Sequence, residues 1–173
     1  GLNDAAYDID LARIGTIHSF CLELLREFAL QADINPREEI VDEATANTIR
    51  SEVVRETILR VLETEEIPHL SALFSRFSIR EIRSILDSLV RDTDRLRKLA
   101  SDESLPTAER VMLKIAQVAA RAFATRLADL ELIDFDRVIS RARDLLGTNP
   151  QVRSTLRRHI RTLIVDEFQD VDP

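Results

Sequence analysis

Glycine is almost absent from this chain, and its scarcity limits both the fold and the chemistry. Only three glycines occur in 173 residues, at positions 1, 15 and 147. A β-rich fold with many tight turns needs more of them. A phosphate-binding loop of the form G-x-x-x-x-G-K-[ST] needs two glycines and a lysine at fixed spacing, and no such set exists here. Leu, Ile, Val, Ala, Arg and Glu dominate instead, with 5% aromatic residues, and this composition favours helices packed on aliphatic seams.

Apolar residues recur at intervals of three and four through most of the chain, which predicts a series of amphipathic helices. We expect a first helix with Ser19 as its N-cap, a second over 43–64, a short one over 68–77 and one over 107–130. Ser78 is expected to cap a single long helix whose apolar stripe is Ile82, Ile85, Leu86, Leu89 and Leu96.

The segment Leu132–Leu146 has the clearest boundaries. Asp134 is the expected N-cap, and Gly147 stands where a helix commonly ends in a left-handed residue. Asn149-Pro150 then predicts another short helix, because proline is well tolerated at the first helical position. The apolar face of that helix would be Val152, Leu156 and Ile160.

Two short strands are predicted at the ends of this helical block, over 11–17 and 162–165. Parallel strands are normally buried within larger sheets, so two of them separated by such a long excursion indicate an incomplete sheet. The expected fold is therefore mostly α, a multi-helix insertion flanked by two short strands of an α/β domain. The boundaries are 1–20 and 161–173 for the strand segments and 21–160 for the helical part.

The formal charge of −7 argues against extensive contact with a phosphate backbone, whose affinity for proteins depends on clustered Lys and Arg. Any DNA contact must therefore be local. One candidate set lies near a helix end and comprises Arg91, Arg95, Arg97 and Lys98; a second precedes the last strand and comprises Arg153, Arg157, Arg158 and Arg161. The alternative is that these arginines are solvated or ion-paired, since Asp92, Asp94 and Asp102 lie among the first set.

The single cysteine, Cys21, cannot form an internal disulfide, which favours a cytoplasmic protein. Within Phe-Cys-Leu it is expected to be a small buried apolar residue rather than a nucleophile. No apolar run is long enough to cross a membrane and no leader pattern precedes one, so we expect no membrane partner. The first residue is not methionine, from which we expect an excised or processed piece.

The chain ends on LIVDEFQDVDP, in which an aliphatic run is followed by carboxylates. Asp166 and Glu167 would lie at the carboxyl end of a buried strand, the edge where open α/β sheets bind ligands. A carboxylate there can hold Mg²⁺ through water, and its neighbour can take a proton from an attacking water. Gln169 can orient a water or sense a phosphate, and Asp170 can anchor loop amides. The alternative is a solvated acidic turn.

LIVDEFQDVDP resembles motif II, the Walker B element, of superfamily 1A DNA helicases, the group of UvrD, Rep and PcrA and of the RecB and AddA helicase-nuclease subunits. GTIHSFC, residues 15–21, resembles their motif Ic. LIDFDRVISRARDLL is similar to the helix that precedes motif II, and DINPREEIVDEATA follows a looser pattern of the family. All occur in the family's order, so the resemblance frames the whole chain.

The resemblance implies a RecA-like motor domain interrupted by the helical subdomain called 1B, and an enzyme that couples ATP hydrolysis to movement on single-stranded DNA and to duplex unwinding. Asp166 would hold the Mg²⁺ of ATP together with Glu167, which would also activate the hydrolytic water, and Gln169 would link nucleotide state to DNA. Thr16 and His18 would lie near single-stranded DNA. For His18 the alternative is a helix-start histidine that hydrogen bonds to backbone.

Some positions depart from the family pattern. Val171 stands where threonine is common, and Arg137 stands where many relatives carry an acid. Phe168 and Asp172-Pro173 lean toward the RecB and AddA branch. Subdomain 1B touches duplex DNA in relatives, which makes Arg91 and Arg95 the first candidates for that contact.

Without a Walker A loop, this chain is expected neither to bind ATP tightly nor to hydrolyse it, and no Mg²⁺ or ATP is expected on it alone. Its partners would be DNA, the remaining helicase domains and a nuclease domain or subunit. The competing hypothesis is a free-standing helical interaction module with an incidental acidic tail. A longer reading frame with a Walker A loop upstream would distinguish them.

Overall fold

The computed structural model describes residues 14–64 and 67–166, and these residues are mostly helical. The elements are α2 (Ile17–Glu27), α3 (Ala29–Ala32), β1 (Glu39–Ile40), α4 (Glu43–Thr64), α5 (Leu70–Arg76), α6 (Ile79–Arg91), α7 (Thr93–Ala100), α8 (Thr107–Asp129), β2 (Leu132–Ile133), α9 (Phe135–Thr148) and α10 (Pro150–His159). The expectation of a mostly α fold is confirmed. None of the described helices is both long and apolar enough to cross a membrane.

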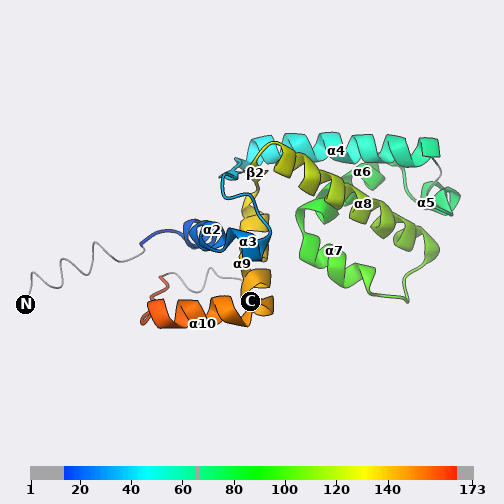
Figure 1. The fold of residues 1–173 in the computed structure, drawn as a ribbon. Helices are drawn as coiled ribbons and strands as arrows, with labels where there is room; N and C mark the ends of the chain where they lie inside the picture. Colours follow the sequence, from blue (N-terminus) through cyan, green and yellow to red (C-terminus); the bar gives the residue numbers. More distant parts are fainter. Residues whose placement is uncertain (1–13, 65–66, 167–173) are drawn as a thin grey trace, which may run out of the picture. The chain divides into compact units, whose positions relative to one another are not determined.

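The chain divides into two compact units, one of residues 37–138 and one of residues 1–36 with 139–173. In the first, here called the central unit, α8 packs against α4, α5, α6 and α7 (Figure 1). Its core is a single aliphatic cluster with one buried aromatic ring, and its fully buried members include Val54, Leu73, Leu86, Ala116, Ala119 and Phe123. Ala116 and Ala119 lie on one face of α8, where small side chains allow neighbouring helices to approach closely.

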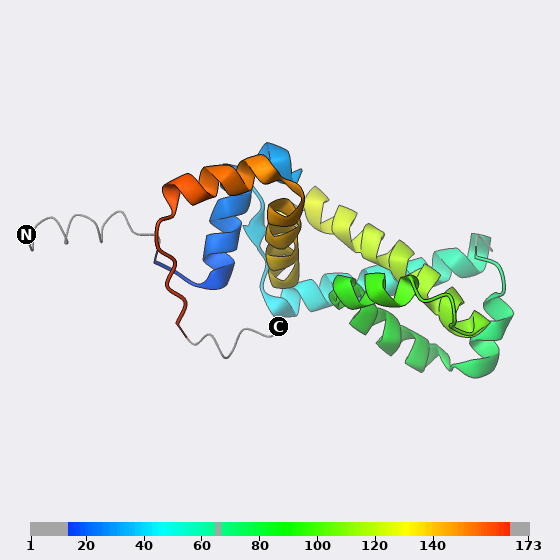
Figure 2. The same ribbon diagram turned by 90° about the horizontal axis from the view of Figure 1, so that it is seen from below.

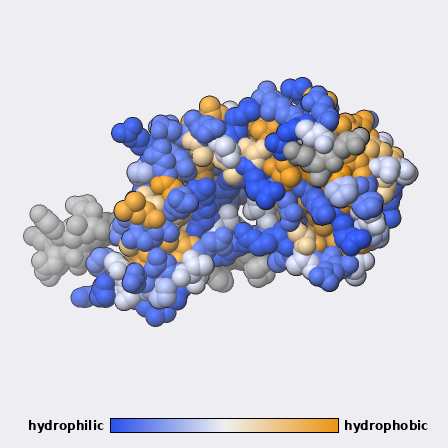
Figure 3. Space-filling view, turned by 45° about the vertical axis from the view of Figure 1, so that its right-hand side comes forward, coloured by the Kyte–Doolittle hydropathy of each residue, from blue (hydrophilic) through white to orange (hydrophobic). Residues whose placement is uncertain are grey.

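The second unit, here called the terminal unit, comprises α2, α3, α10 and the part of α9 after Val138 (Figure 2). Leu24 and Leu25 of α2 are fully buried, and Ala142, Leu145 and Val152 contribute from α9 and α10. On the face drawn in Figure 3, hydrophilic residues cover most of the surface and hydrophobic residues form scattered patches.

Side chains at the helix ends explain most helix boundaries. Ser78 caps α6 in a full capping box, with its hydroxyl accepting from the Glu81 N–H and the Glu81 carboxylate accepting from the Ser78 N–H at 2.8 Å. Asn149 accepts from the Gln151 and Val152 N–H groups at the start of α10, where Pro150 occupies the first turn. The Ser78 cap and the start of a helix at Pro150 agree with the sequence prediction.

Three expectations about the helices are wrong, and in two of them a local hydrogen bond sets the boundary. The first helix begins at Ile17, with Thr16 as N-cap accepting from the Ser19 N–H at 3.1 Å, so Ser19 is not the cap. The single long helix after Ser78 is two helices, because Asp92 ends α6 and caps α7 through the Arg95 N–H at 2.9 Å. Gly147 lies within α9 and has no positive φ.

Two helices carry large apolar side chains that the core does not bury. In α4, Leu59 and Leu62 are 48% and 43% exposed, while Val54, Ile58 and Val61 fill the core. In α9, Phe135 and Ile139 are 42% and 38% exposed beside the buried Val138. The apolar surface of these helices is broader than the stripe that packing uses.

The two strands are not where the sequence predicts them. β1 and β2 pair in parallel, with Glu39 opposite Leu132 and Ile40 opposite Ile133. Residues 162–165 form no strand, and Leu163 and Ile164 are 69% and 87% exposed. Of the other predicted strand, residues 11–13 lie outside the described residues and 14–16 are not a strand. A strand needs a hydrogen-bonding neighbour, and no strand lies beside either segment in the described part of the chain.

Candidate functional site

The segments that resemble motif Ic and motif II line one cavity of the terminal unit, although they are far apart in the sequence. The cavity has a volume of about 470 Å³ and is lined by Ile14, Gly15, Thr16, Ile17, Ser19, Phe20, Cys21, Glu23, Leu163, Ile164, Val165 and Asp166. Among the described residues that line the cavity, only Glu23 and Asp166 carry a charged side chain. The structure therefore brings two candidate site residues, Thr16 and Asp166, to the same cavity.

The first turn of α2 fixes the position of Thr16. The Thr16 hydroxyl accepts from the Ser19 N–H, and the Ser19 hydroxyl donates back to the Thr16 carbonyl oxygen at 2.8 Å. A Cβ atom on Gly15 would lie 2.5 Å from the Ser19 hydroxyl oxygen, so glycine leaves room for this turn. Next to it, His18 is half-buried and is not among the residues that line the cavity.

Cys21 lies in the same cavity and is half-buried. Burial raises the pKa of its thiol, which lowers the thiolate fraction and therefore its reactivity. This agrees with an apolar role for Cys21 rather than a nucleophilic one.

The acidic end of the chain is described only in part. Asp166 is exposed at the edge of the cavity, whereas Glu167, Gln169 and Asp170 lie outside the described residues. Within the described ranges, no group of three His, Cys, Asp or Glu side chains could enclose a metal ion. Mg²⁺ is usually bound by one or two carboxylates plus substrate phosphates, so the carboxylate of Asp166 fits as a donor for MgATP in chemical type.

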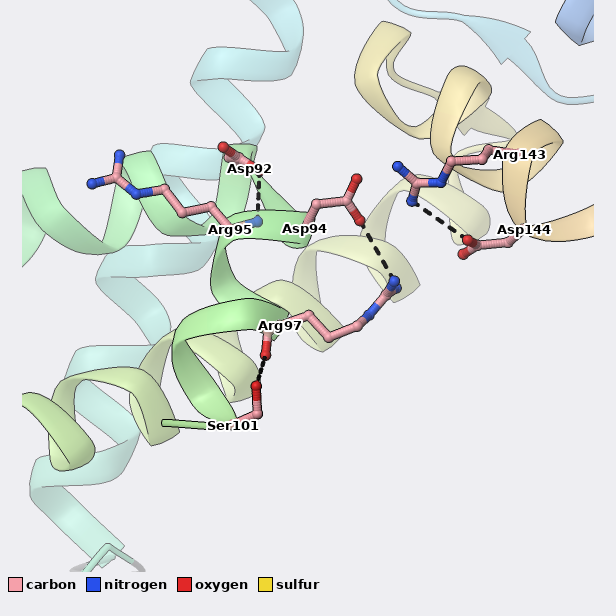
Figure 4. A network of polar contacts seen from close by, with 7 residues as sticks. All are labelled: Asp92, Asp94, Arg95, Arg97, Ser101, Arg143 and Asp144. Carbon is pink, nitrogen blue, oxygen red and sulfur yellow. Dashed lines mark hydrogen bonds and ion pairs between the residues drawn. The ribbon is translucent and has the colours of Figure 1, made fainter. Parts of the chain in front are cut away.

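Two of the four residues of the first basic set, Arg91 and Arg97, are engaged in ion pairs. Arg91 lies 3.0 Å from a Glu43 carboxylate oxygen and 3.5 Å from one of Asp136. Arg97 lies 3.5 Å from Asp94, and Arg95 uses its backbone N–H in the cap of α7, with its side chain exposed (Figure 4). A phosphate group would have to compete with two carboxylates for Arg91.

Only part of the buried polar cluster at the start of α9 can be predicted from the sequence. Asp134 is the expected cap, and its carboxylate accepts from the Arg137 N–H at 2.8 Å. The Arg137 guanidinium also lies 3.5 Å from Asp134, donates to the Ala120 carbonyl oxygen at 3.2 Å and stacks over the Phe123 ring at 5.1 Å from its centre. Arg137 therefore joins α9 to α8, a role that an acid at this position could not perform.

Comparison with known proteins gives one family and a set of partial relatives. The model of the UvrD/REP helicase N-terminal domain matches residues 2–173. An ATP-dependent helicase/nuclease subunit of Desulforamulus reducens is 31% identical over 98 residues, which are 57% of this chain and 8% of that protein. The corresponding subunits of Lysinibacillus sphaericus and Listeria monocytogenes are 29% identical over 86 residues and 39% identical over 46 residues.

These alignments cover 50% of this chain and 6% of the Lysinibacillus protein, and 27% of this chain and 4% of the Listeria protein. The chain thus spans less than a tenth of the length of the relatives it matches. No solved structure matches it.

Proposed function

Because the chain belongs to the UvrD/REP helicase family, we propose that it is part of an ATP-dependent DNA helicase of the UvrD and RecB type. The whole protein would couple ATP hydrolysis to translocation on single-stranded DNA and to duplex unwinding in repair or recombination. The observation that carries this proposal is the family match over residues 2–173, which ends on a Walker B-like sequence. Activity, DNA substrates and partners belong to the longer protein.

The acidic end is proposed to serve the nucleotide. Bound MgATP supplies the phosphoryl group that is transferred to water. Asp166 and Glu167 would hold the metal, Asp166 through a water, and the Glu167 carboxylate would also accept a proton from the attacking water. Gln169 would link nucleotide state to DNA through its amide, and Asp170 would fix the loop by accepting from backbone amides.

Thr16 and His18 are proposed to contact single-stranded DNA at the motor cleft. The cavity of the terminal unit supports a link between the two functions, because Thr16 and Asp166 both line it. If nucleotide binding moves the Asp166 side chain, the movement would therefore occur close to Thr16 and the segment proposed to contact DNA. The hydrogen bonds between Thr16 and Ser19 would hold that segment in one conformation.

We assign residues 1–20 and 161–173 to motor domain 1A and residues 21–160 to the 1B-like subdomain. The exposed apolar side chains of Ile14, Leu163 and Ile164 support an assignment to an incomplete sheet, since such side chains are normally covered. The remaining helicase domains would cover them. A nuclease domain or subunit is a further proposed partner, in line with the helicase/nuclease names of the relatives.

The test is Glu167→Gln in the full-length protein. Loss of the carboxylate should reduce DNA-stimulated ATP hydrolysis by about 10²- to 10⁴-fold, while ATP binding persists because Gln keeps the side-chain volume. Asp172→Asn removes a nearby charge without touching the proposed pair and should hydrolyse ATP at close to the wild-type rate. Unchanged hydrolysis in Glu167→Gln would reject the assignment, and a full-length protein without ATPase activity would favour the interaction module instead.

The isolated chain is proposed to be inactive. With glycines only at 1, 15 and 147, it cannot contain the loop whose amides and lysine bind the triphosphate. Magnesium-dependent ATP hydrolysis by a pure preparation of the 173-residue chain would overturn this proposal.

A further inference from the structure

The second basic set has a different electrostatic environment from the first. No Asp or Glu occurs between Asp144 and Asp166, whereas four arginines and one histidine do. Within a chain of formal charge −7, this segment carries a local excess of positive charge. It comprises the end of α9, α10 and the residues that follow, all within the terminal unit.

The four arginines of this segment differ in the hydrogen bonds that their side chains make. Arg153 is structural, because its guanidinium donates to the carbonyl oxygens of Leu146 and Gly147 at the end of α9, the latter at 2.9 Å. Arg158 hydrogen bonds only to the uncharged hydroxyls of Ser154 and Thr155, at 3.3 and 3.2 Å. Among the described residues, the side chains of Arg157 and Arg161 make no hydrogen bond or ion pair, and both are exposed.

We propose that Arg157, Arg158 and Arg161, here called the α10 patch, bind the phosphate backbone of DNA. Three exposed guanidinium groups that have no carboxylate partner among the described residues can release counterions from a phosphate backbone and donate to its oxygens. By contrast, Arg91 and Arg97 would first have to leave their carboxylates. The inference places the DNA contact of this chain on the second basic set rather than the first.

Two alternative roles for the α10 patch agree less well with its residues. Cations in the last turn of a helix stabilise its C-terminal dipole, which accounts for Arg157 and Arg158 but not for Arg161, since α10 ends at His159. An acidic protein surface is a second conceivable partner. Protein interfaces are usually centred on buried aromatic or aliphatic anchors, however, and within residues 157–161 the one such residue, Ile160, is already half-buried.

The experiment measures binding of the 173-residue chain to a labelled single strand and to a labelled duplex by fluorescence anisotropy, from about 50 to 200 mM salt. Three phosphate contacts predict a slope of log K against log salt of about −2.7 for the duplex and about −2 for the single strand. Binding to either with a slope in this range supports the proposal. No binding to either at the lowest salt overturns it.

Two variants and a matched control localise the contact. Arg157→Ala with Arg158→Ala and Arg161→Ala should lose most of the binding, whereas the same three positions changed to Lys should keep the salt slope because the charges remain. The control changes Arg60, Arg80 and Arg110 to Ala, three exposed arginines of the central unit, and alters the net charge equally. An equal loss in the control and the α10 variant would overturn the proposal, as would unchanged binding in the α10 variant.

A third arm tests the partner class with a polyglutamate peptide as competitor. We expect unlabelled DNA to displace the labelled DNA far more effectively than polyglutamate does at equal charge concentration. Equal displacement by the two competitors would reassign the patch to acidic proteins and overturn the proposal. The inference rests on the proposed function only in the choice of DNA as the probe. If full-length Glu167→Gln loses ATP hydrolysis but the α10 variant binds DNA as well as the wild type does, the proposed function stands and the inference about the α10 patch is rejected.

Discussion

Asp134 is subject to opposing electrostatic effects. Its side chain is 13% exposed, and burial raises the pKa of the carboxyl group by disfavouring the charged form. The hydrogen bond from the Arg137 N–H and the positive charges of Arg137 and Arg50 lower that pKa, while Asp136 raises it. The net effect is a raised pKa, so the ion pair with Arg137 does not fully offset the loss of hydration.

Asp134→Asn separates the capping role of this side chain from its charge. Asparagine caps helices as well as aspartate does, and it carries no charge that burial could penalise. A raised pKa in the folded state means that the contribution of Asp134 to stability is complete below its unfolded pKa, about 3.9, and is lost as the pH rises through the higher folded value. At neutral pH we therefore expect the Asn variant to be no less stable than the wild-type chain.

Urea unfolding across a pH series checks this expectation. The free energy of unfolding of the Asn variant, minus that of the wild type, should increase as the pH rises from about 3.9. Asp136→Asn is the control. Because the Asp136 side chain is 62% exposed, the free energy of unfolding of this variant, relative to the wild type, should change little with pH. If the Asn variant instead loses stability relative to the wild type as the pH rises, the ion pair outweighs burial.

At the scale of elements, the capping box of α6 is the clearest local determinant. The Ser78 hydroxyl accepts from the Glu81 N–H at 3.3 Å, and the Glu81 carboxylate accepts from both the N–H and the hydroxyl of Ser78. Ser78→Ala removes the side-chain cap, and we expect the central unit to lose about 1 kcal/mol of stability. Ser84→Ala, at an exposed position inside the same helix, should be neutral or slightly stabilising, because alanine is the better helix former. Chemical denaturation of both variants measures the difference, and an equal effect of the two substitutions would show that the cap contributes nothing.

The caps also show how far the sequence can predict this fold. Ser78, Asp134 and Asn149 are visible in the sequence because each bonds to an N–H two or three residues away. Asp92 has the same chemistry, but a continuous apolar stripe through Leu89 and Leu96 conceals the break that it makes between α6 and α7. Periodicity predicts that residues share a face, and it does not reveal whether the backbone between them is continuous.

The strands depend on partners that local patterns do not encode. β1 and β2 have only two residues each, and they pair with each other although α4 to α8 lie between them in the sequence. Leu163, Ile164 and Val165 have the composition of a buried strand, yet no strand lies beside them in the described part of the chain. For the candidate site, the sequence identifies Thr16 and Asp166, but only the structure shows that they line one cavity.

At the scale of the molecule, the central unit carries the larger core. Its buried cluster draws on α4 to α8 and is contained within residues 37–138. We expect residues 37–138, produced alone, to fold with helical circular dichroism and to unfold in one cooperative urea transition, because the fragment keeps every member of that cluster. A non-cooperative transition, or loss of helical signal, would show that the cluster depends on the terminal unit.

The terminal unit, in contrast, has an apolar cavity that its own described residues do not cover. Ile14, Leu163 and Ile164 are 81%, 69% and 87% exposed, and all three line that cavity. Adjacent exposed aliphatic residues promote association when no other chain segment covers them, because joining two such surfaces removes both from water. We therefore expect the 173-residue chain to self-associate as its concentration rises, through the terminal unit.

Leu163→Ser combined with Ile164→Ser should reduce this self-association with little effect on the stability of the monomer, since neither side chain is buried. Leu30→Ser is a suitable control, because Leu30 is 95% exposed in the same unit and does not line the cavity. Sedimentation velocity over a concentration series compares the three proteins. The double variant should sediment as a monomer at concentrations where the wild type and Leu30→Ser form larger species, because only the double variant removes apolar surface at the cavity. If Leu30→Ser were as effective as the double variant, general surface hydrophobicity rather than the cavity would be the cause of association.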